Sequence, residues 1–213
     1  MAHLSAELAA RVSRSHGIVT VAELRADGMS SKAIKLLLLH GTLVRLHHGV
    51  LRIATSPDTF ESRCVAACRA DRQVVISGTA AARLWEFRHV FRQETPIALV
   101  AHDRTPITSG VLLRRTNRLD AGDAVERDDG IRVATPPRAW FDCARDLDDE
   151  RFERLTEWVL DRHSSTPTLW QLTSRMSTRG RPGLARVHRV LSQRSDWQKP
   201  AGSGIELKVL KGL

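Results

Sequence analysis

Eight polar side chains within residues 31–52 have the chemistry needed to hold phosphate groups. They are Ser31, Lys32, Lys35, His40, Arg45, His47, His48 and Arg52. Ammonium, guanidinium and protonated imidazole groups donate charge-assisted hydrogen bonds to phosphate oxygens, and a serine hydroxyl donates a neutral one. What this set binds depends on the elements that carry it.

The segment before these residues has the local signals of a short helix. Thr20 can act as an N-cap, and Glu23, three positions later, completes a capping box. The helix is expected over residues 21–26. Gly28 ends it, because glycine favours the backbone conformation that terminates helices.

A second helix is expected directly after this turn. Ser30 and Ser31 are alternative N-caps for it. It runs to His40, and Gly41 ends it. Four of the eight polar side chains lie on this helix.

The other four lie on a predicted β-hairpin. Residues 43–46 and 50–53 are β-prone runs, and the His47-His48-Gly49 turn between them contains a glycine. Two helices joined by a turn and followed by a hairpin form a winged helix-turn-helix. In that arrangement the second helix enters the major groove of duplex DNA and the hairpin lies along the backbone. We therefore predict that the eight side chains contact duplex DNA.

The same segment resembles the N-terminal domain of AbiEi-type antitoxins, which belong to type IV toxin–antitoxin systems and are especially common in actinobacterial genomes. The pattern is carried by Gly17, Ile18, Val19, Thr20, Gly28, Met29, Ser30, Gly41, Leu43, Val44, Arg45, His47, Gly49 and Val50. A second family-like segment is carried by Gly130, Ile131, Val133, Ala134, Thr135, Pro136, Arg138 and Ala139. Family members usually place several arginines in the second helix, where this chain has Lys32 and Lys35. The resemblance implies a regulator that represses its own promoter and opposes a nucleotidyltransferase toxin.

Composition is that of a cytosolic protein without a membrane segment. The chain has 213 residues, 42% of them hydrophobic, and no apolar run approaches the roughly 20 residues of a membrane span. Three cysteines without paired spacing argue against a disulfide framework. We expect a cytoplasmic protein.

The net charge of +9 is concentrated at the two ends of the chain. Residues 1–55 have seven Lys/Arg and three Asp/Glu, a net +4, and residues 163–213 have a net +7. Residues 56–162 have a net −2. Positive ends favour contact with nucleic acid, but basic composition alone is weak evidence for it.

The overall expectation is an α+β protein in three parts. Residues 1–55 form the winged helix-turn-helix, residues 56–200 form a mixed α+β partner or sensor domain with a helical C-terminal part, and residues 201–213 form the third part. Short strands are expected at 97–101, 111–115 and 131–134, and helices at 59–70, 80–87, 138–145, 149–162, 166–172 and 184–191. Arg175, Arg179 and Arg181 are interpreted as a solvated basic loop, with phosphate binding as the alternative.

Three other groups have chemistry that we interpret as structural. Cys64 and Cys68 are four positions apart and resemble half of a metal site, but buried small residues are the simpler interpretation. Ser77 is expected to cap a helix, because no base or oxyanion site surrounds it. His47 and His48 are adjacent on the hairpin and point in opposite directions, so we expect no metal there.

Residues 201–213 resemble the first helix of a Vsr-like endonuclease domain of the PD-(D/E)XK superfamily. Ser203 and Glu206 match its S-x-x-E opening, and seven residues follow Glu206. One carboxylate does not bind and orient Mg²⁺ for hydrolysis. We therefore expect no enzyme activity, no catalytic residue, and no metal or other cofactor in this chain.

Three functions remain open from the sequence. The first is a DNA-binding antitoxin whose partners are its own promoter and a cognate nucleotidyltransferase toxin. The second is the targeting part of a Vsr-like endonuclease. The third is a protein-interaction module without DNA contacts. The third is favoured by Leu36 and Leu39, which fall off the core-facing stripe of the second helix.

Overall fold

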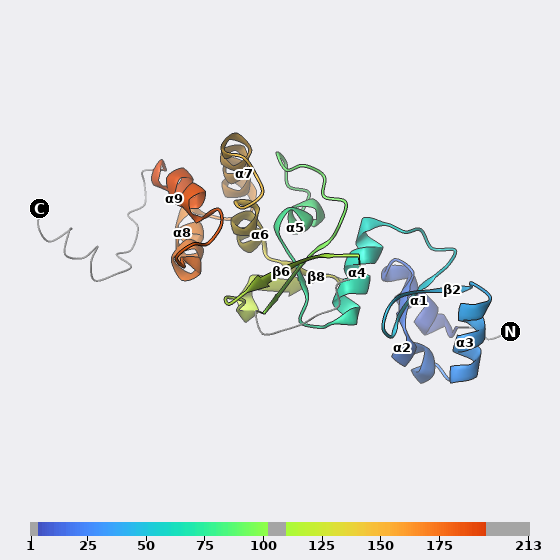
Figure 1. The fold of residues 1–213 in the computed structure, drawn as a ribbon. Coiled ribbons are helices and arrows are strands. Elements are labelled where there is room, and N and C mark those ends of the chain that lie inside the picture. The colour runs from blue at the N-terminus through green and yellow to red at the C-terminus, as the bar shows by residue number, and fades with distance from the viewer. Residues whose placement is uncertain (1–3, 102–109, 195–213) are drawn as a thin grey trace, which may run out of the picture.

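The computed structural model describes residues 4–101 and 110–194 (Figure 1). Within these residues the fold is α+β, with a winged helix-turn-helix followed by a mixed sheet and a helical C-terminal part, as predicted. Residues 201–213, which resemble the start of a nuclease domain, lie outside the described residues. Among those that the structure describes, no helix is both long enough and apolar enough to cross a bilayer.

The N-terminal unit alternates helices with short strands. Its elements are α1 (Ala6–Arg14), β1 (Ile18–Thr20), α2 (Val21–Ala26), α3 (Ser31–Leu39), β2 (Leu43–His47) and β3 (Val50–Ile53). The strands form an antiparallel sheet in the order β1-β3-β2. Helix α3 and the β2-β3 hairpin are therefore the second helix and the wing of the predicted arrangement.

Hydrogen bonds at the N-caps determine where α2 and α3 begin. The Thr20 hydroxyl accepts a hydrogen bond from the Glu23 backbone N–H at 3.1 Å, and the Glu23 carboxylate accepts one from the Thr20 N–H at 2.8 Å. This is the predicted capping box. Of the two alternatives for α3, Ser30 is the N-cap, and its hydroxyl accepts from the Ala33 N–H at 3.2 Å.

The wing differs from the prediction in the length of its turn. Strand β2 continues to His47, which pairs with Val50, so that the turn is His48-Gly49 alone. The register shifts between Arg45 and His47, which places one extra residue, a β-bulge, on this strand. The bulge takes up the residue that we had assigned to a three-residue turn.

The small sheet is covered on both faces. Because neighbouring side chains on a strand point to opposite faces, Val19 and Leu51 enter the core between α1, α2 and α3. Ile18 and Val50 point the other way and join the large core of the rest of the chain. The winged helix is thus packed onto the second half of the molecule, and a division at residue 55 stays a prediction.

The rest of the chain is built around a five-stranded mixed sheet. Its strands are β4 (Val75–Ile76), β5 (Ile97–Ala101), β6 (Leu112–Thr116), β7 (Ala124–Glu126) and β8 (Arg132–Ala134). They lie in the order β6-β5-β4-β8-β7. The β5-β6 and β4-β8 pairs are parallel, and the β4-β5 and β7-β8 pairs are antiparallel.

Helices connect and cover this sheet. They are α4 (Phe60–Ala70), α5 (Gly78–Leu84), α6 (Pro136–Cys143), α7 (Asp149–Arg162), α8 (Thr166–Met176) and α9 (Leu184–Ser192). Helix α4 contacts all three strands of the small sheet and also β4, so it lies between the two sheets (Figure 1). Helix α5 packs on α6, and α7, α8 and α9 continue the helical layer away from the winged helix.

Several predicted boundaries are corrected. Helix α4 begins at Phe60 under a Thr59 cap, α5 begins at Gly78 and ends at Leu84, and α6 begins at Pro136. Helix α8 continues beyond residue 172 to Met176. The short strands β1, β4 and β7 were not predicted, because two or three residues carry too little periodicity to be recognised.

Candidate nucleic-acid interface

Helix α3 has one face in the core and one face in solvent. Ile34 is buried, and Leu37 and Leu38 pack against the same core. Lys32, Lys35, Leu36 and Leu39 lie at positions i, i+3, i+4 and i+7, so they share the opposite face. All four are exposed. The exposed face is therefore a mixed surface of cations and leucines.

The lysines of this face have no carboxylate partner among the described residues. Two acids of the unit are engaged elsewhere: Asp27 accepts a hydrogen bond from the Ser5 N–H at 2.9 Å. Glu23 accepts from Thr20 and from Arg69 of α4. Because neither carboxylate neutralises it, the face of α3 keeps its positive charge and can attract an anion.

Arg25 is a further cation that the sequence analysis missed. It lies in the last turn of α2, is exposed, and donates from Nη2 to the Ser31 hydroxyl at 3.1 Å. Its position in the sequence could have indicated this role. Arg25 comes just before the turn at Gly28, and that turn brings the end of α2 close to the beginning of α3. Arg25 and Ser31 together supply donors at the N-terminus of α3.

The wing presents two of its predicted contacts to solvent. Arg45 and His48 are exposed, and so is His40 at the C-terminal end of α3. His47 is half-buried, its Nδ1 atom is buried, and that atom has no hydrogen-bond partner among the described residues. Burial lowers the pKa of His47, so the ring is neutral at pH 7. It contributes no positive charge there.

Arg52 lies on β3 of the wing, but its side chain is largely covered. Its side chain is 15% exposed, and its Nη1 atom lies 3.6 Å from Asp58 Oδ1, in the segment that leads to α4. A guanidinium that is covered and paired in this way is not available to a phosphate without breaking that contact. We therefore leave Arg52 out of the proposed interface.

The cysteines and Ser77 have structural positions. Cys64 and Cys68 are buried, and burial raises the pKa of the Cys68 thiol to about 12, so it stays protonated. Within the part of the chain that the structure describes, no three His, Cys, Asp or Glu side chains are grouped to hold a metal ion. Ser77 is at the N-cap position of α5, but its hydroxyl donates to Asp142 Oδ2 at 2.6 Å and does not cap the helix.

The three arginines that we had interpreted as a solvated basic loop do not all lie in a loop, since Arg175 is in the last turn of α8. The Arg175 guanidinium binds Asp120 and Asp123, and the Arg181 side chain is 16% exposed beside Asp142. Of the three arginines that we had interpreted as a solvated loop, only Arg179 is exposed. The other two are held by carboxylates of the folded structure.

The order of its helices and the pairing of its strands place the N-terminal unit in the class of winged helix-turn-helix domains. Residues 7–54 match the family model described as "Transcriptional regulator, AbiEi antitoxin". Among solved structures, the chain is similar to that of the RV2827C protein from Mycobacterium tuberculosis. The two are 19% identical over 90% of this chain and 84% of that chain, with a TM-score of 0.44. None of the curated proteins matches the chain.

The family match covers the N-terminal unit alone. It includes α1, α2, α3 and the wing, which is the segment where the sequence resembles AbiEi-type antitoxins. It does not reach residues 201–213, so it gives no support to a Vsr-like endonuclease domain.

Proposed function

We propose that this protein is a DNA-binding transcriptional regulator of the antitoxin type, and that its winged helix binds its own promoter. The observation that carries the proposal is the exposed face of α3, on which Lys32 and Lys35 have no carboxylate partner among the described residues. The match of residues 7–54 to a family of transcriptional regulators supports it.

The proposed docking places α3 in the major groove. Lys32, Lys35 and the Arg25–Ser31 pair at the beginning of the helix then contact phosphates or base edges. Leu36 and Leu39 follow the lysines on the same face of α3 and meet the groove floor, where the thymine methyl group is the apolar feature available to them. In the wing, Arg45 and His48 contact the backbone.

A mobility-shift experiment tests this function. The full chain is titrated into a duplex containing its own promoter at low salt, with a duplex of scrambled sequence as the control. We expect a shift that is weakened by added salt, because each phosphate contact releases counterions. The absence of any shift at low salt rejects the proposal.

A second candidate is a protein contact made by the same helix. Leu39 is 78% exposed and Leu36 is 44% exposed, which is unusual for two leucines on one helix face. Substitution of Leu39 by Ala separates the two candidates. If α3 reads DNA, the variant loses discrimination between the promoter and the scrambled duplex. If α3 binds a protein, DNA binding is unchanged.

The partner of the remaining region is proposed to be a nucleotidyltransferase toxin, and the protein is proposed to act in the cytoplasm. Residues 56–162 have a net charge of −2, which disfavours a large DNA contact there. Co-expression of a candidate nucleotidyltransferase toxin with the full chain, and separately with residues 1–55, tests this part. Neutralisation by residues 1–55 alone contradicts it.

A further inference from the structure

An arginine-lined cleft lies in the second half of the chain, away from the winged helix. It is formed by β6 and the residues after it, the C-terminal end of α6, and the loop between α8 and α9. Its volume is about 360 Å³. In Figure 1 these elements lie on the far side of α4 from α3. The arginines that line it are Arg114, Arg115, Arg118, Arg145, Arg179 and Arg181.

Two of these arginines already have a carboxylate partner. Arg114 makes a bidentate ion pair with Asp146, with both hydrogen bonds at 2.8 Å. Arg181 lies 3.6 Å from Asp142 Oδ1. Asp142 is the carboxylate that lines the cleft among the described residues.

The other four arginines carry the charge of the cleft. They are Arg115, Arg118, Arg145 and Arg179, and all are exposed. None of them forms an ion pair with a carboxylate of residues 4–101 or 110–194. Like charges that converge in this way repel one another, so the arrangement is stabilised when an anion enters.

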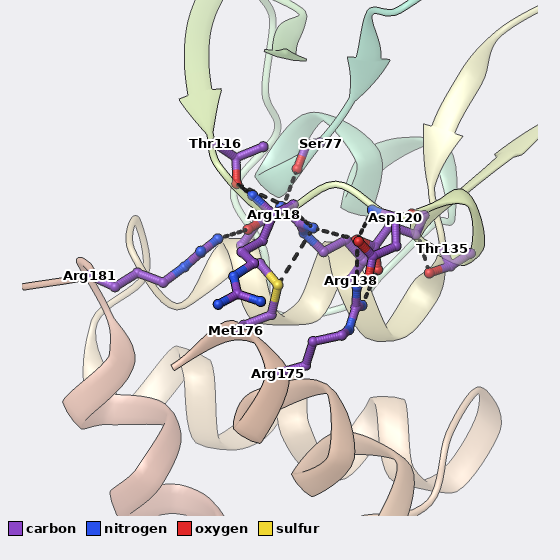
Figure 2. Close-up of polar contacts among 11 residues, drawn as sticks. Ser77, Thr116, Arg118, Asp120, Thr135, Arg138, Arg175, Met176 and Arg181 are labelled. Carbon is purple, nitrogen blue, oxygen red and sulfur yellow. Dashed lines mark hydrogen bonds and ion pairs between the residues drawn. The ribbon is translucent and has the colours of Figure 1, made fainter. Parts of the chain in front are cut away.

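A buried polar network fixes the position of Arg118. The backbone carbonyl of Arg118 accepts hydrogen bonds from Arg138 Nη1 at 2.8 Å and from the Thr116 hydroxyl at 3.1 Å (Figure 2). Arg138 is completely buried and pairs with Asp123 and Asp142, each at 2.8 Å. Arg118 therefore projects from a backbone that is held in place before any ligand binds.

The loop that carries Arg179 and Arg181 is also held. Gly183 lies against the backbone of Ala144, so closely that an added Cβ would be 2.6 Å from the Ala144 carbonyl carbon. The Arg181 guanidinium lies over the Phe141 ring, 5.0 Å from its centroid. Because burial lowers the pKa of Arg181, its charged form gains from a nearby anion.

We propose that this cleft binds the phosphate chain of a small ligand, such as a nucleoside diphosphate or triphosphate. Planar guanidinium groups bind phosphate oxygens in pairs, and several adjacent phosphates are needed to satisfy four unpaired arginines. The apolar lining consists of Leu99 and Phe141, which are 4% and 2% exposed, and of Pro182, which is exposed. The one aromatic ring among them, Phe141, is buried beneath the Arg181 guanidinium and offers no face on which a base can stack, so the phosphates and not the base are recognised.

Isothermal titration calorimetry of the full chain at 150 mM salt tests the proposal. The probes are inorganic triphosphate, ATP, GTP and a short DNA duplex. We expect the first three to bind with similar affinity, and Arg118→Gln and Arg179→Gln each to weaken them about tenfold. Arg88→Gln is the matched control, because Arg88 is exposed and lies outside the cleft.

Three results overturn the proposal. One is that none of the small anions binds. Another is that Arg88→Gln weakens binding as much as the cleft variants do, which indicates general attraction to a basic protein. The third is that only the duplex responds to Arg118→Gln, which makes the cleft a nucleic-acid contact. Promoter binding by Arg118→Gln is measured in parallel, so failure of this proposal is distinguishable from failure of the proposed function.

Discussion

Arg69 of α4 donates a hydrogen bond from Nη1 to Glu23 Oε2, the carboxylate oxygen that also completes the capping box of α2, at 2.7 Å. The same guanidinium donates from Nη2 to the Ser15 hydroxyl at 2.7 Å. One side chain of the second half of the chain therefore holds the end of α1 and the beginning of α2. The orientation of the helix-turn-helix is set by this contact together with the covered face of the small sheet.

Replacing Arg69 with Met should reduce the free energy of unfolding by about 2 kcal/mol, since it removes charge-assisted hydrogen bonds from a part-buried site. Urea denaturation measures the change. Arg63→Met is the control on the same helix, because the Arg63 side chain is 42% exposed and pairs with an exposed Asp58. It should cost less than about 1 kcal/mol. Equal losses in the two variants would argue against a special role of Arg69.

Arg138→Met should destabilise the protein by about 3 kcal/mol, because it removes a fully buried cation from both Asp123, which keeps only Arg175, and Asp142, which keeps only the more distant Arg181. Arg151→Met should change stability by less than about 1 kcal/mol, because Arg151 and Asp148 are both more than half exposed. The two variants are compared by urea denaturation under the same conditions. A loss for Arg138→Met no larger than that for Arg151→Met would mean that the network is not important for stability.

Two glycines of the loop after α8 give a matched pair. Gly180 and Gly183 have φ values of 77° and 82°, so alanine is strained at both by about 1 kcal/mol. Only at Gly183 does the added Cβ also meet the backbone of Ala144, since nothing lies within 4 Å of it at Gly180. Gly183→Ala should therefore lower the unfolding midpoint clearly more than Gly180→Ala. Indistinguishable midpoints would show that the loop moves freely away from α6.

The winged helix was predictable because its signals are local. Thr20 and Glu23 are three residues apart and cap one helix between them, and Ser30 caps the next. The turn of the wing was predicted one residue too long, because a β-bulge is fixed by cross-strand pairing and not by the residues of the turn. The exposure of Leu36 and Leu39 also followed from helical spacing alone.

The arginine-lined cleft was not predictable, because it is assembled from distant segments. Arg118, Arg145 and Arg179 meet only through the packing of β6, α6 and the loop after α8. The burial of Arg138 could not be predicted from the sequence either, since arginine is rarely buried unless it is paired. Its partner Asp123 lies in a 3₁₀ turn directly before β7, a strand that the sequence did not reveal.

Stability should fall when the pH drops below about 6.5, the ordinary pKa of histidine. Burial lowers the pKa of His47 and, with the nearby Arg162 charge, that of His163. The unfolded chain therefore takes up protons at a higher pH than the folded chain does, so acid favours unfolding. The stability that the protein has while these two histidines are neutral is fully present above pH 6.5 and is lost as the pH falls below it.

Urea midpoints at pH 8, 7, 6 and 5.5 measure this dependence. In His47→Gln and His163→Gln the urea midpoint should fall less between pH 7 and pH 5.5 than it does in the unsubstituted protein. Between pH 8 and pH 7 the midpoint of each variant should change by the same amount as that of the unsubstituted protein. An unchanged slope in both variants would mean that other groups cause the acid sensitivity.

The salt dependence of promoter binding tests the central claim most directly. Fluorescence anisotropy with a labelled promoter duplex gives the association constant of the full chain at several salt concentrations. The Lys32→Gln/Lys35→Gln double variant removes two proposed phosphate contacts, so its logarithmic salt slope should be smaller by about 2. Arg151→Gln/Arg154→Gln removes the same charge from α7 and should leave affinity and slope unchanged. The account is contradicted if the unsubstituted chain does not bind, or if the two double variants bind with the same affinity and the same slope.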